Sequence, residues 1–220
     1  MRIAVIGGTG KEGRGLALGW AQAGQTVIVG SRSPERAQQA AGEINATVGR
    51  EAASGSTNRG AAIAGDIVVL TVPYDAQETT LWDIRDGVRG KVLVTVTVPI
   101  DTGNARRLRV VPGGSAAEEA QTLLGPETHV VAAFQSISHT HLEKTKSIDS
   151  DVLVCGDDAG ARQEVVRLAA LLGLRALDAG PVRNARVVEG LTVVLLEINR
   201  RYKSRGSGIR VTGLPDGGNE

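Results

Sequence analysis

Short apolar runs recur along this chain, and segments with apolar residues at helical spacing separate them. Apolar runs bounded by turn residues are typical of buried strands. The pattern predicts strands at Arg2–Ile6, Thr26–Val29, Ile67–Val72, Lys91–Val98, Val130–Phe134, Asp151–Cys155 and Ala176–Leu177. Strands that alternate with helices are typical of an α/β protein with helices on both faces of a parallel sheet. We therefore expect a doubly wound, mostly parallel sheet.

The intervening segments predict helices whose ends are marked by glycine or proline. The first helix, which follows the first strand, is expected to end at Ala23. Further helices are expected over Pro34–Val48, Ala76–Ile84, Ala116–Leu124, Ala161–Leu172 and Val187–Tyr202. Pro34 stands in a first turn, where a missing N–H costs little. The segment before Gly114 is rich in Gly and Arg and predicts a loop. The last residues, 214–220, predict a disordered tail.

Composition narrows the class of protein. Of 220 residues, 41% are apolar but only 2% aromatic, so Val, Ile, Leu and Ala must fill the core. A net charge of +1 with dispersed Lys and Arg excludes the basic stripe of a nucleic-acid binder and favours small-molecule ligands. The single Cys155 excludes an intramolecular disulfide framework and predicts a buried core residue.

The sequence also predicts a cytoplasmic protein without a membrane segment. No apolar stretch approaches the roughly eighteen residues that a membrane-spanning helix needs. Met1 and Arg2 lead directly into the first expected strand, which leaves no room for a signal peptide.

The first strand is followed by Gly8-Thr9-Gly10-Lys11-Glu12-Gly13, which reads G-x-G-x-x-G where a strand would turn into a helix. That context predicts a dinucleotide site, because the turn must be tight and a pyrophosphate must approach the free N–H groups of the helix N-terminus. We expect a side chain at Gly8 or Gly10 to occupy the space of the ligand. The alternative is an ordinary glycine-rich turn.

The second strand indicates which dinucleotide is bound. An enzyme that binds NAD(H), which lacks the 2′-phosphate, usually has Asp or Glu there to accept a hydrogen bond from the ribose 2′-hydroxyl. Here Ser31-Arg32 follows Gly30, and Arg36 lies one helical turn further on. Two guanidinium groups and a hydroxyl favour the 2′-phosphate of NADP(H). The alternative is that both arginines are ordinary surface residues.

The third strand ends at Val72-Pro73-Tyr74, which predicts a position beside the nicotinamide ribose. Ligands of open α/β sheets bind at the carboxyl ends of the strands, where this segment falls. A proline that merely ends the strand is the alternative.

These residues resemble a known family, the NADPH-dependent reductases of coenzyme F-420, which is an 8-hydroxy-5-deazaflavin. The resemblance is carried by Met1–Gly13, Val29–Arg32, Asp66–Pro73, Val154–Asp158, Leu177–Pro181, Asn184–Arg186 and Glu189, and it covers nearly the whole chain. It implies a Rossmann-like fold with an NADP-binding domain over residues 1–180. It also implies a short helical C-terminal part, residues 181–213, that contributes to the deazaflavin pocket and to a homodimer.

The resemblance further implies direct hydride transfer between nicotinamide C4 and deazaflavin C5, which requires neither a metal nor a protein nucleophile. It places NADP(H) on Thr9, Gly10, Lys11, Glu12, Ser31, Arg32, Arg36, Val72 and Pro73, with Val98 and Ile137 near the nicotinamide. It places the deazaflavin on Pro73, Tyr74, Gln135–Ile137 and Gly206–Gly208, including Ser207. Gln135 and Ser138 depart from members with His and Pro there, and the segment from Asp101 to Gly114 also differs.

Two other functions are compatible with the sequence. One is an NADPH-dependent flavin or ferric reductase of the same fold, because an ordinary flavin differs from the deazaflavin at one ring atom. The other is a non-catalytic NADP(H)-binding redox sensor, which would lack a pocket for a second ring. The retained Gly206–Ile209 segment argues against the sensor.

Two pairs of polar residues are better explained by structural roles than by chemistry. His139 and His141 lie two residues apart without further ligands at suitable spacing, so we expect no metal site. Asp157 and Asp158 precede an expected helix and predict N-terminal capping. The sequence therefore names no catalytic acid or base.

Overall fold

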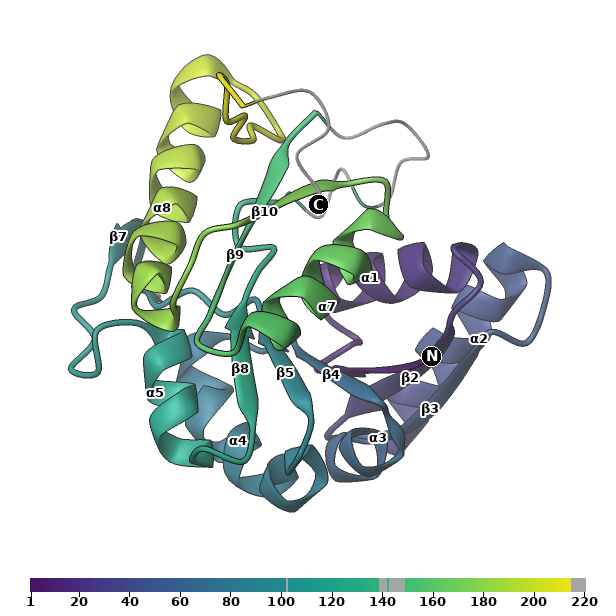
Figure 1. Ribbon diagram of the computed structural model, residues 1–220. Helices are drawn as coiled ribbons and strands as arrows, with labels where there is room; N and C mark the ends of the chain where they lie inside the picture. Colours follow the sequence, from purple (N-terminus) through teal and green to yellow (C-terminus); the bar gives the residue numbers. More distant parts are fainter. Residues whose placement is uncertain (102, 139–141, 143–148, 215–220) are drawn as a thin grey trace.

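The computed structural model describes residues 1–101, 103–138, 142 and 149–214. Its centre is an eight-stranded sheet with the strand order β10-β9-β8-β5-β4-β1-β2-β3 (Figure 1). The strands are β1 (Arg2–Ile6), β2 (Thr26–Ser31), β3 (Ala53–Thr57), β4 (Ile67–Leu70), β5 (Val92–Thr95), β8 (His129–Ala132), β9 (Asp151–Gly156) and β10 (Arg175–Asp178). Neighbouring strands pair in parallel except β8 and β9, which are antiparallel. The expected doubly wound, mostly parallel sheet is confirmed.

Helices cover both faces of this sheet (Figure 1). One face packs against α1 (Lys11–Gln22), α2 (Pro34–Val48) and α7 (Ala159–Ala170). The other packs against α3 (Asn58–Ala64), α4 (Tyr74–Val88), α5 (Ala116–Leu124) and the start of α8 (Ala185–Tyr202), which follows the 3-10 turn η1 (Val182–Asn184). Strand faces buried on both sides explain the continuous apolar runs of β1 and β4.

The strand β3 and the helix α3 occupy the segment between α2 and β4, which the apolar pattern left unassigned. Strand β3 has the sequence Ala-Ser-Gly-Ser-Thr and no apolar run, so it gives no strand signal. It pairs with β2 and is tied to α2 by Asn45, whose Nδ2 donates to the Ala53 carbonyl at 2.9 Å and whose Oδ1 accepts the Ala53 N–H at 2.7 Å. Tertiary hydrogen bonds, not side-chain burial, hold this edge strand in place.

A short antiparallel hairpin replaces part of the loop expected before Gly114. It consists of β6 (Ile100–Asp101) and β7 (Asn104–Leu108). In Figure 1 the hairpin strand β7 runs beside α8, and the two elements are in contact. The carboxyl edge of the sheet is therefore bounded by the glycine loop at one side and by the hairpin with α8 at the other.

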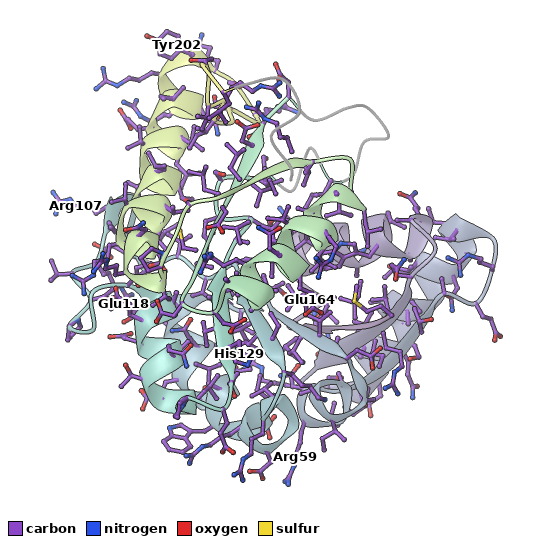
Figure 2. All side chains as sticks on the ribbon, viewed as in Figure 1. Arg59, Arg107, Glu118, His129, Glu164 and Tyr202 are labelled. Carbon is purple, nitrogen blue, oxygen red and sulfur yellow. The ribbon has the colours of Figure 1, made fainter. Side chains whose placement is uncertain are left out.

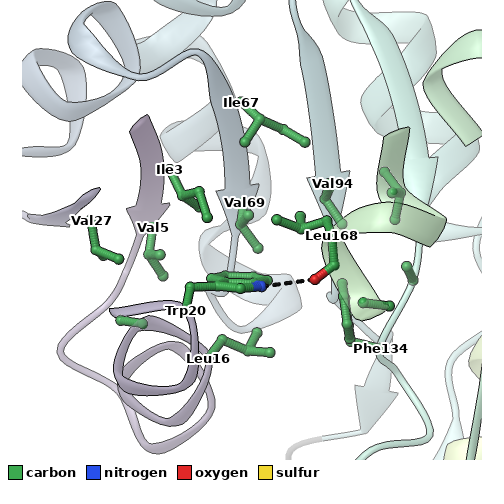
Figure 3. Packing of buried hydrophobic residues seen from close by; sticks show 14 of the residues in the cluster. Ile3, Val5, Leu16, Trp20, Val27, Ile67, Val69, Val94, Phe134 and Leu168 are labelled. Atoms are coloured by element: carbon green, nitrogen blue, oxygen red, sulfur yellow. Dashed lines mark hydrogen bonds between the residues drawn. The ribbon is translucent and has the colours of Figure 1, made fainter. Parts of the chain in front are cut away.

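An aromatic pair lies in the core on the face of the sheet that α1 and α7 cover. Trp20 on α1 and Phe134 after β8 meet edge to face with ring centroids 6.0 Å apart. The indole Nε1 of Trp20 donates to the Leu168 carbonyl at 3.0 Å, so α1 and α7 are joined across the sheet face (Figure 3). Phe134 has a φ of 71°, a left-handed conformation that non-glycine residues seldom adopt. This turn leads into Gln135–Ile137, which line a cavity described below.

The structural roles expected of Asp158 and Cys155 are confirmed. Asp158 is the N-cap of α7 and accepts the Ala161 N–H at 2.7 Å. The same expectation for Asp157 is wrong, because its Oδ1 accepts the Val182 N–H at 3.0 Å and so holds the turn before α8. Cys155 is fully buried, and burial raises the pKa of its thiol to about 11, so it is an inert core residue. His139, His141 and the tail beyond residue 214 lie outside the described residues.

Candidate functional site

The glycine loop joins β1 to α1 with the geometry of an anion site. The Gly8 N–H donates to the Gly30 carbonyl at 3.0 Å, and the Gly10 N–H donates to the Gly7 carbonyl at 3.0 Å. Gly10 is the N-cap residue of α1, and no side chain caps this helix end. The first N–H groups of α1 are consequently available for a ligand, and the helix dipole favours an anion there.

The glycines of this loop serve two different purposes. A Cβ on Gly8 would lie 2.8 Å from the Val5 carbonyl oxygen, and one on Gly13 would overlap the Thr71 hydroxyl. Gly8 lies in the turn against the backbone of β1, and Gly13 lies where α1 approaches the residue that follows β4, so neither position has room for a side chain. A Cβ on Gly10 would meet only the Gly7 carbonyl at 3.4 Å and would otherwise face open space. The expectation of ligand space therefore suits Gly10, whereas at Gly8 the reason is close packing of the turn against β1 and β2.

The end of β2 presents the residues expected to select a 2′-phosphate. Ser31 is buried, and its hydroxyl accepts the Ser33 N–H at 3.2 Å. Ser33 caps α2 by accepting the Arg36 N–H at 3.3 Å. Arg32 and Arg36 are both exposed, and within the described part of the chain neither guanidinium forms an ion pair. Two unpaired guanidinium groups beside one helix N-terminus form a suitable receptor for a phosphate.

The carboxyl ends of β4 and β5 form the floor between the two sides of the site. Val72, Pro73 and Val98 lie just beyond these strands and are half-buried or exposed. The Thr97 hydroxyl donates to the Val72 carbonyl at 3.2 Å, which holds the two strand ends together. The sequence reasoning did not single out Thr97, since a threonine at a strand end carries no distinctive signal.

A cavity of about 270 Å³ brings together predicted residues from distant parts of the chain. Glu12 comes from the glycine loop side, Gln135 and Ile137 follow β8, and Ser207 follows α8. The remaining wall is formed by Ile100, Ser136, Ser138, Thr192, Leu195, Leu196, Asn199 and Arg205. The start of α1 and the expected second-ring residues thus share one cavity.

The amide of Gln135 is held in one orientation. Its Nε2 donates to the Thr95 carbonyl at 2.9 Å, while its Oε1 is buried without a hydrogen-bond partner in the described structure. The Thr192 hydroxyl of α8 donates to the Gln135 backbone carbonyl at 2.8 Å and fixes the loop. Because a buried acceptor without a partner costs free energy, this oxygen is suited to an N–H donor of a ligand.

Tyr74 does not line this cavity. Its hydroxyl donates to Glu119 on α5 at 2.7 Å, and the Arg109 guanidinium lies 5.9 Å from its ring centroid. Burial, followed by the contact with Glu119, raises the pKa of Tyr74 to about 12. Tyr74 belongs to a separate cavity of about 470 Å³ between α4 and α5. Its assignment to the deazaflavin is therefore the least supported of the predicted contacts.

Two further residues of the site were missed by the sequence reasoning. Asn58 is buried, and its Oδ1 accepts the Gly7 N–H at 3.4 Å, so it supports the glycine loop from α3. Asn199 on α8 accepts the Ser207 N–H at 2.9 Å through its Oδ1. Both are amides that pair with backbone groups distant in sequence, and no spacing rule predicts such pairing.

Comparison with known proteins adds to this geometry. Residues 2–99 match the family described as NADP oxidoreductase, coenzyme F420-dependent. An F420-dependent NADP reductase from Methanothermobacter thermautotrophicus is 46% identical, over 98% of this chain and 97% of its own. Another from Methanocaldococcus jannaschii is 41% identical, over 97% of this chain and 99% of its own. The chain belongs to the F420-dependent NADP reductase family.

A solved structure agrees on the fold of this F420-dependent NADP reductase family member. The crystal structure of a candidate F420-dependent NADP-reductase from Arthrobacter sp. FB24 superposes with a TM-score of 0.84 at 24% identity. The match covers 96% of this chain and 99% of the other. No helix in the described part of the chain is both long and apolar enough to cross a membrane.

The electrostatics of the cavity single out one residue of the reductase. The Glu12 side chain is half-buried, but its Oε1 atom is fully buried and has no hydrogen-bond partner among the described residues. Burial raises the pKa of Glu12 to about 8, so the carboxyl is mostly neutral at pH 7. A neutral carboxyl can donate one hydrogen bond as well as accept.

Proposed function

We propose that this protein transfers a hydride directly between NADP(H) and coenzyme F-420. The observation that carries the proposal is the shared cavity, in which Glu12 of the nucleotide-binding helix faces Gln135, Ile137 and Ser207. Relatives that match the chain over nearly its whole length are named F420-dependent NADP reductases. NADP(H) and coenzyme F-420 are accordingly its two substrates.

On this proposal, the glycine loop and the end of β2 bind NADP(H). The N–H groups at the start of α1 hold the pyrophosphate, with Gly10 leaving room for its approach. Ser31, Arg32 and Arg36 hold the 2′-phosphate. Val72, Pro73 and Val98 at the strand ends then support the nicotinamide and its ribose.

The cavity wall from β8 and the C-terminal segment binds the deazaflavin. Gln135 offers an acceptor of fixed direction, Ile137 offers an apolar surface, and the segment at Ser207 is anchored by Asn199. Rings held face to face need no protein nucleophile, because orientation alone lowers the barrier to hydride transfer. The residues therefore bind, orient and exclude water.

The test is to mix the purified protein with NADPH and the deazaflavin and to follow the deazaflavin absorbance. We expect NADPH-dependent bleaching that saturates in both substrates. Parallel reactions with FMN in place of the deazaflavin, with and without ferric iron, test the alternative function as a flavin or ferric reductase. Turnover with FMN but not with the deazaflavin would favour that alternative, and nucleotide binding without any turnover would favour a redox sensor.

We also propose that α8 makes the protein a homodimer, as the resemblance implies. Apolar residues form an outward stripe along this helix at Val187, Leu191, Val194 and Ile198, and Val187 and Val194 are 68% and 53% exposed. The spacing of four, three and four residues is that of a helix–helix seam. Figure 2 shows Tyr202 at the outer end of the same helix, projecting from the body.

Size-exclusion chromatography with light scattering tests the dimer. We expect twice the 22.8 kDa of the single chain. Val194→Glu should shift the mass to the monomer, whereas Glu164→Gln on α7 should not. A monomeric wild-type protein at micromolar concentration would contradict the proposal. Within this proposal, residues 181–213 form the segment that contributes both the dimer contact and part of the cavity.

A further inference from the structure

The reaction requires a proton as well as a hydride, and the cavity offers one group that can supply it. Reduction of the deazaflavin at C5 by a hydride leaves an anion that must be protonated. The hydroxyls of Ser136, Ser138 and Thr192 line the cavity but do not release protons near neutral pH. Gln135 cannot titrate, and its Nε2 is already used by the Thr95 carbonyl.

Glu12 differs from all of these groups. It is the carboxyl that lines the cavity, and its Oε1 is buried and unpartnered in the described structure. It is also the second residue of α1, so its backbone lies at the helix end that receives the pyrophosphate. Its side chain consequently lies between the nucleotide-binding loop and the wall assigned to the deazaflavin.

The N-terminus of α1 favours the carboxylate of Glu12, but few charged side chains oppose or assist its ionisation. Of the described residues that line the cavity, Arg205 carries the other charge. On its own helix Lys11 is exposed, and Arg14 pairs with Glu43 at 2.5 Å. Burial therefore dominates, and it favours the neutral acid while no ligand charge is present.

We propose that Glu12 is the proton donor of the reaction and the counter-ion of the oxidised nicotinamide. The C4–H bond of NADPH breaks, and its hydride, with both electrons, forms the new bond at deazaflavin C5. The Glu12 proton passes to N1 of the deazaflavin anion, and the carboxylate that remains faces the newly cationic nicotinamide. Solvent returns a proton to Glu12 after NADP⁺ leaves, and the reverse reaction follows the same steps backward.

The proposal rests on the proposed function, but its first test needs no deazaflavin. The ring of NADP⁺ is cationic and that of NADPH is neutral, so NADP⁺ should favour the carboxylate and expel the proton. Calorimetric titration in buffers of different ionisation enthalpy measures the protons released on binding each nucleotide. At pH 7 we expect about one more proton released with NADP⁺ than with NADPH.

Matched variants assign that proton. In Glu12→Gln, which keeps the shape of the side chain, the two nucleotides should release equal numbers of protons. Glu51→Gln, at an exposed position outside the cavity, should behave as wild type. A wild-type protein without the difference between nucleotides, or a Glu12→Gln variant that retains it, would overturn the proposal whether or not the enzyme turns over the deazaflavin.

The second test is kinetic. In the direction of deazaflavin reduction, kcat/KM for NADPH of the wild type should fall as pH rises through about 8, because the acid form of Glu12 is required in the free enzyme. Glu12→Gln should lower kcat by about 100-fold or more and abolish this fall, with the KM for NADPH little changed. Glu12→Asp should restore the pH dependence. An unchanged pH profile in Glu12→Gln would refute the role as proton donor.

Discussion

The carboxylate of Glu189 on α8 accepts the backbone N–H of Ala116 at 2.9 Å and thereby joins α8 to the first turn of α5. Its other oxygen accepts the Ala117 N–H at 3.0 Å, and the side chain is only 1% exposed. One residue of the C-terminal segment thus caps a helix that packs on the sheet. Through this contact, Glu189 positions the helix that supplies Thr192 and Asn199 to the cavity.

Glu189→Ala should destabilise the protein by about 2–4 kcal/mol, because two buried N–H groups lose their acceptor. Urea denaturation measures the change. Arg186→Ala is the matched control at the same junction: it removes an ion pair with Glu118 in which the Arg186 side chain is 56% exposed, and Figure 2 shows Glu118 where α5 meets α8. This control should cost less than about 1 kcal/mol. Equal losses in both variants would contradict the capping role.

The same residue should make stability depend on pH. Burial raises the pKa of Glu189 to about 7, above its ordinary value of 4.5, so between these values the folded protein binds more protons than the unfolded chain. Its contribution to stability is therefore greatest below about 4.5 and declines as pH rises to about 7, by roughly 3 kcal/mol. The free energy of unfolding of Glu189→Gln, measured from pH 5 to pH 8, should lack this decline. A parallel decline in both proteins would assign it to other groups.

Arg32→Ala should raise the KM for NADPH by about tenfold or more while changing that for NADH little, because only NADPH carries the 2′-phosphate. Steady-state kinetics with both nucleotides measures the ratio. The effect should weaken at high salt, since an exposed charge pair is screened. Arg85→Ala, an exposed arginine on α4, is the control. Equal effects of Arg32→Ala on both nucleotides would exclude the proposed phosphate contact.

Alanine at Gly8 and at Gly10 should affect different properties. Gly8→Ala should cost about 1–3 kcal/mol of stability, since its Cβ would lie 2.8 Å from the Val5 carbonyl oxygen. Gly10→Ala should fold with a loss below about 1 kcal/mol but bind NADPH about tenfold more weakly, because its Cβ would enter the space of the pyrophosphate. Thermal melts and nucleotide titrations separate the two effects. If Gly10→Ala binds NADPH normally, the loop does not hold the pyrophosphate.

Local features of the sequence determined much of the fold. Continuous apolar runs predicted β1, β4 and β5, because strands buried on both faces must be apolar at every position. The glycine motif predicted the β1–α1 turn, because glycine has no Cβ and can therefore adopt tight turns and allow close packing. By contrast, β3 and the hairpin β6–β7 lack an apolar run and depend on partners elsewhere in the chain.

The sequence by itself thus determined the doubly wound sheet, the position of the glycine loop and the charges at Arg32 and Arg36. Only the tertiary structure decided which side chains share a cavity: it brought Glu12 to Gln135 and Ser207, and it turned Tyr74 toward Glu119. The physical reason is burial. A residue's type and spacing are read along the chain, but the desolvation that leaves the Glu12 carboxyl neutral is imposed by elements that are distant in sequence.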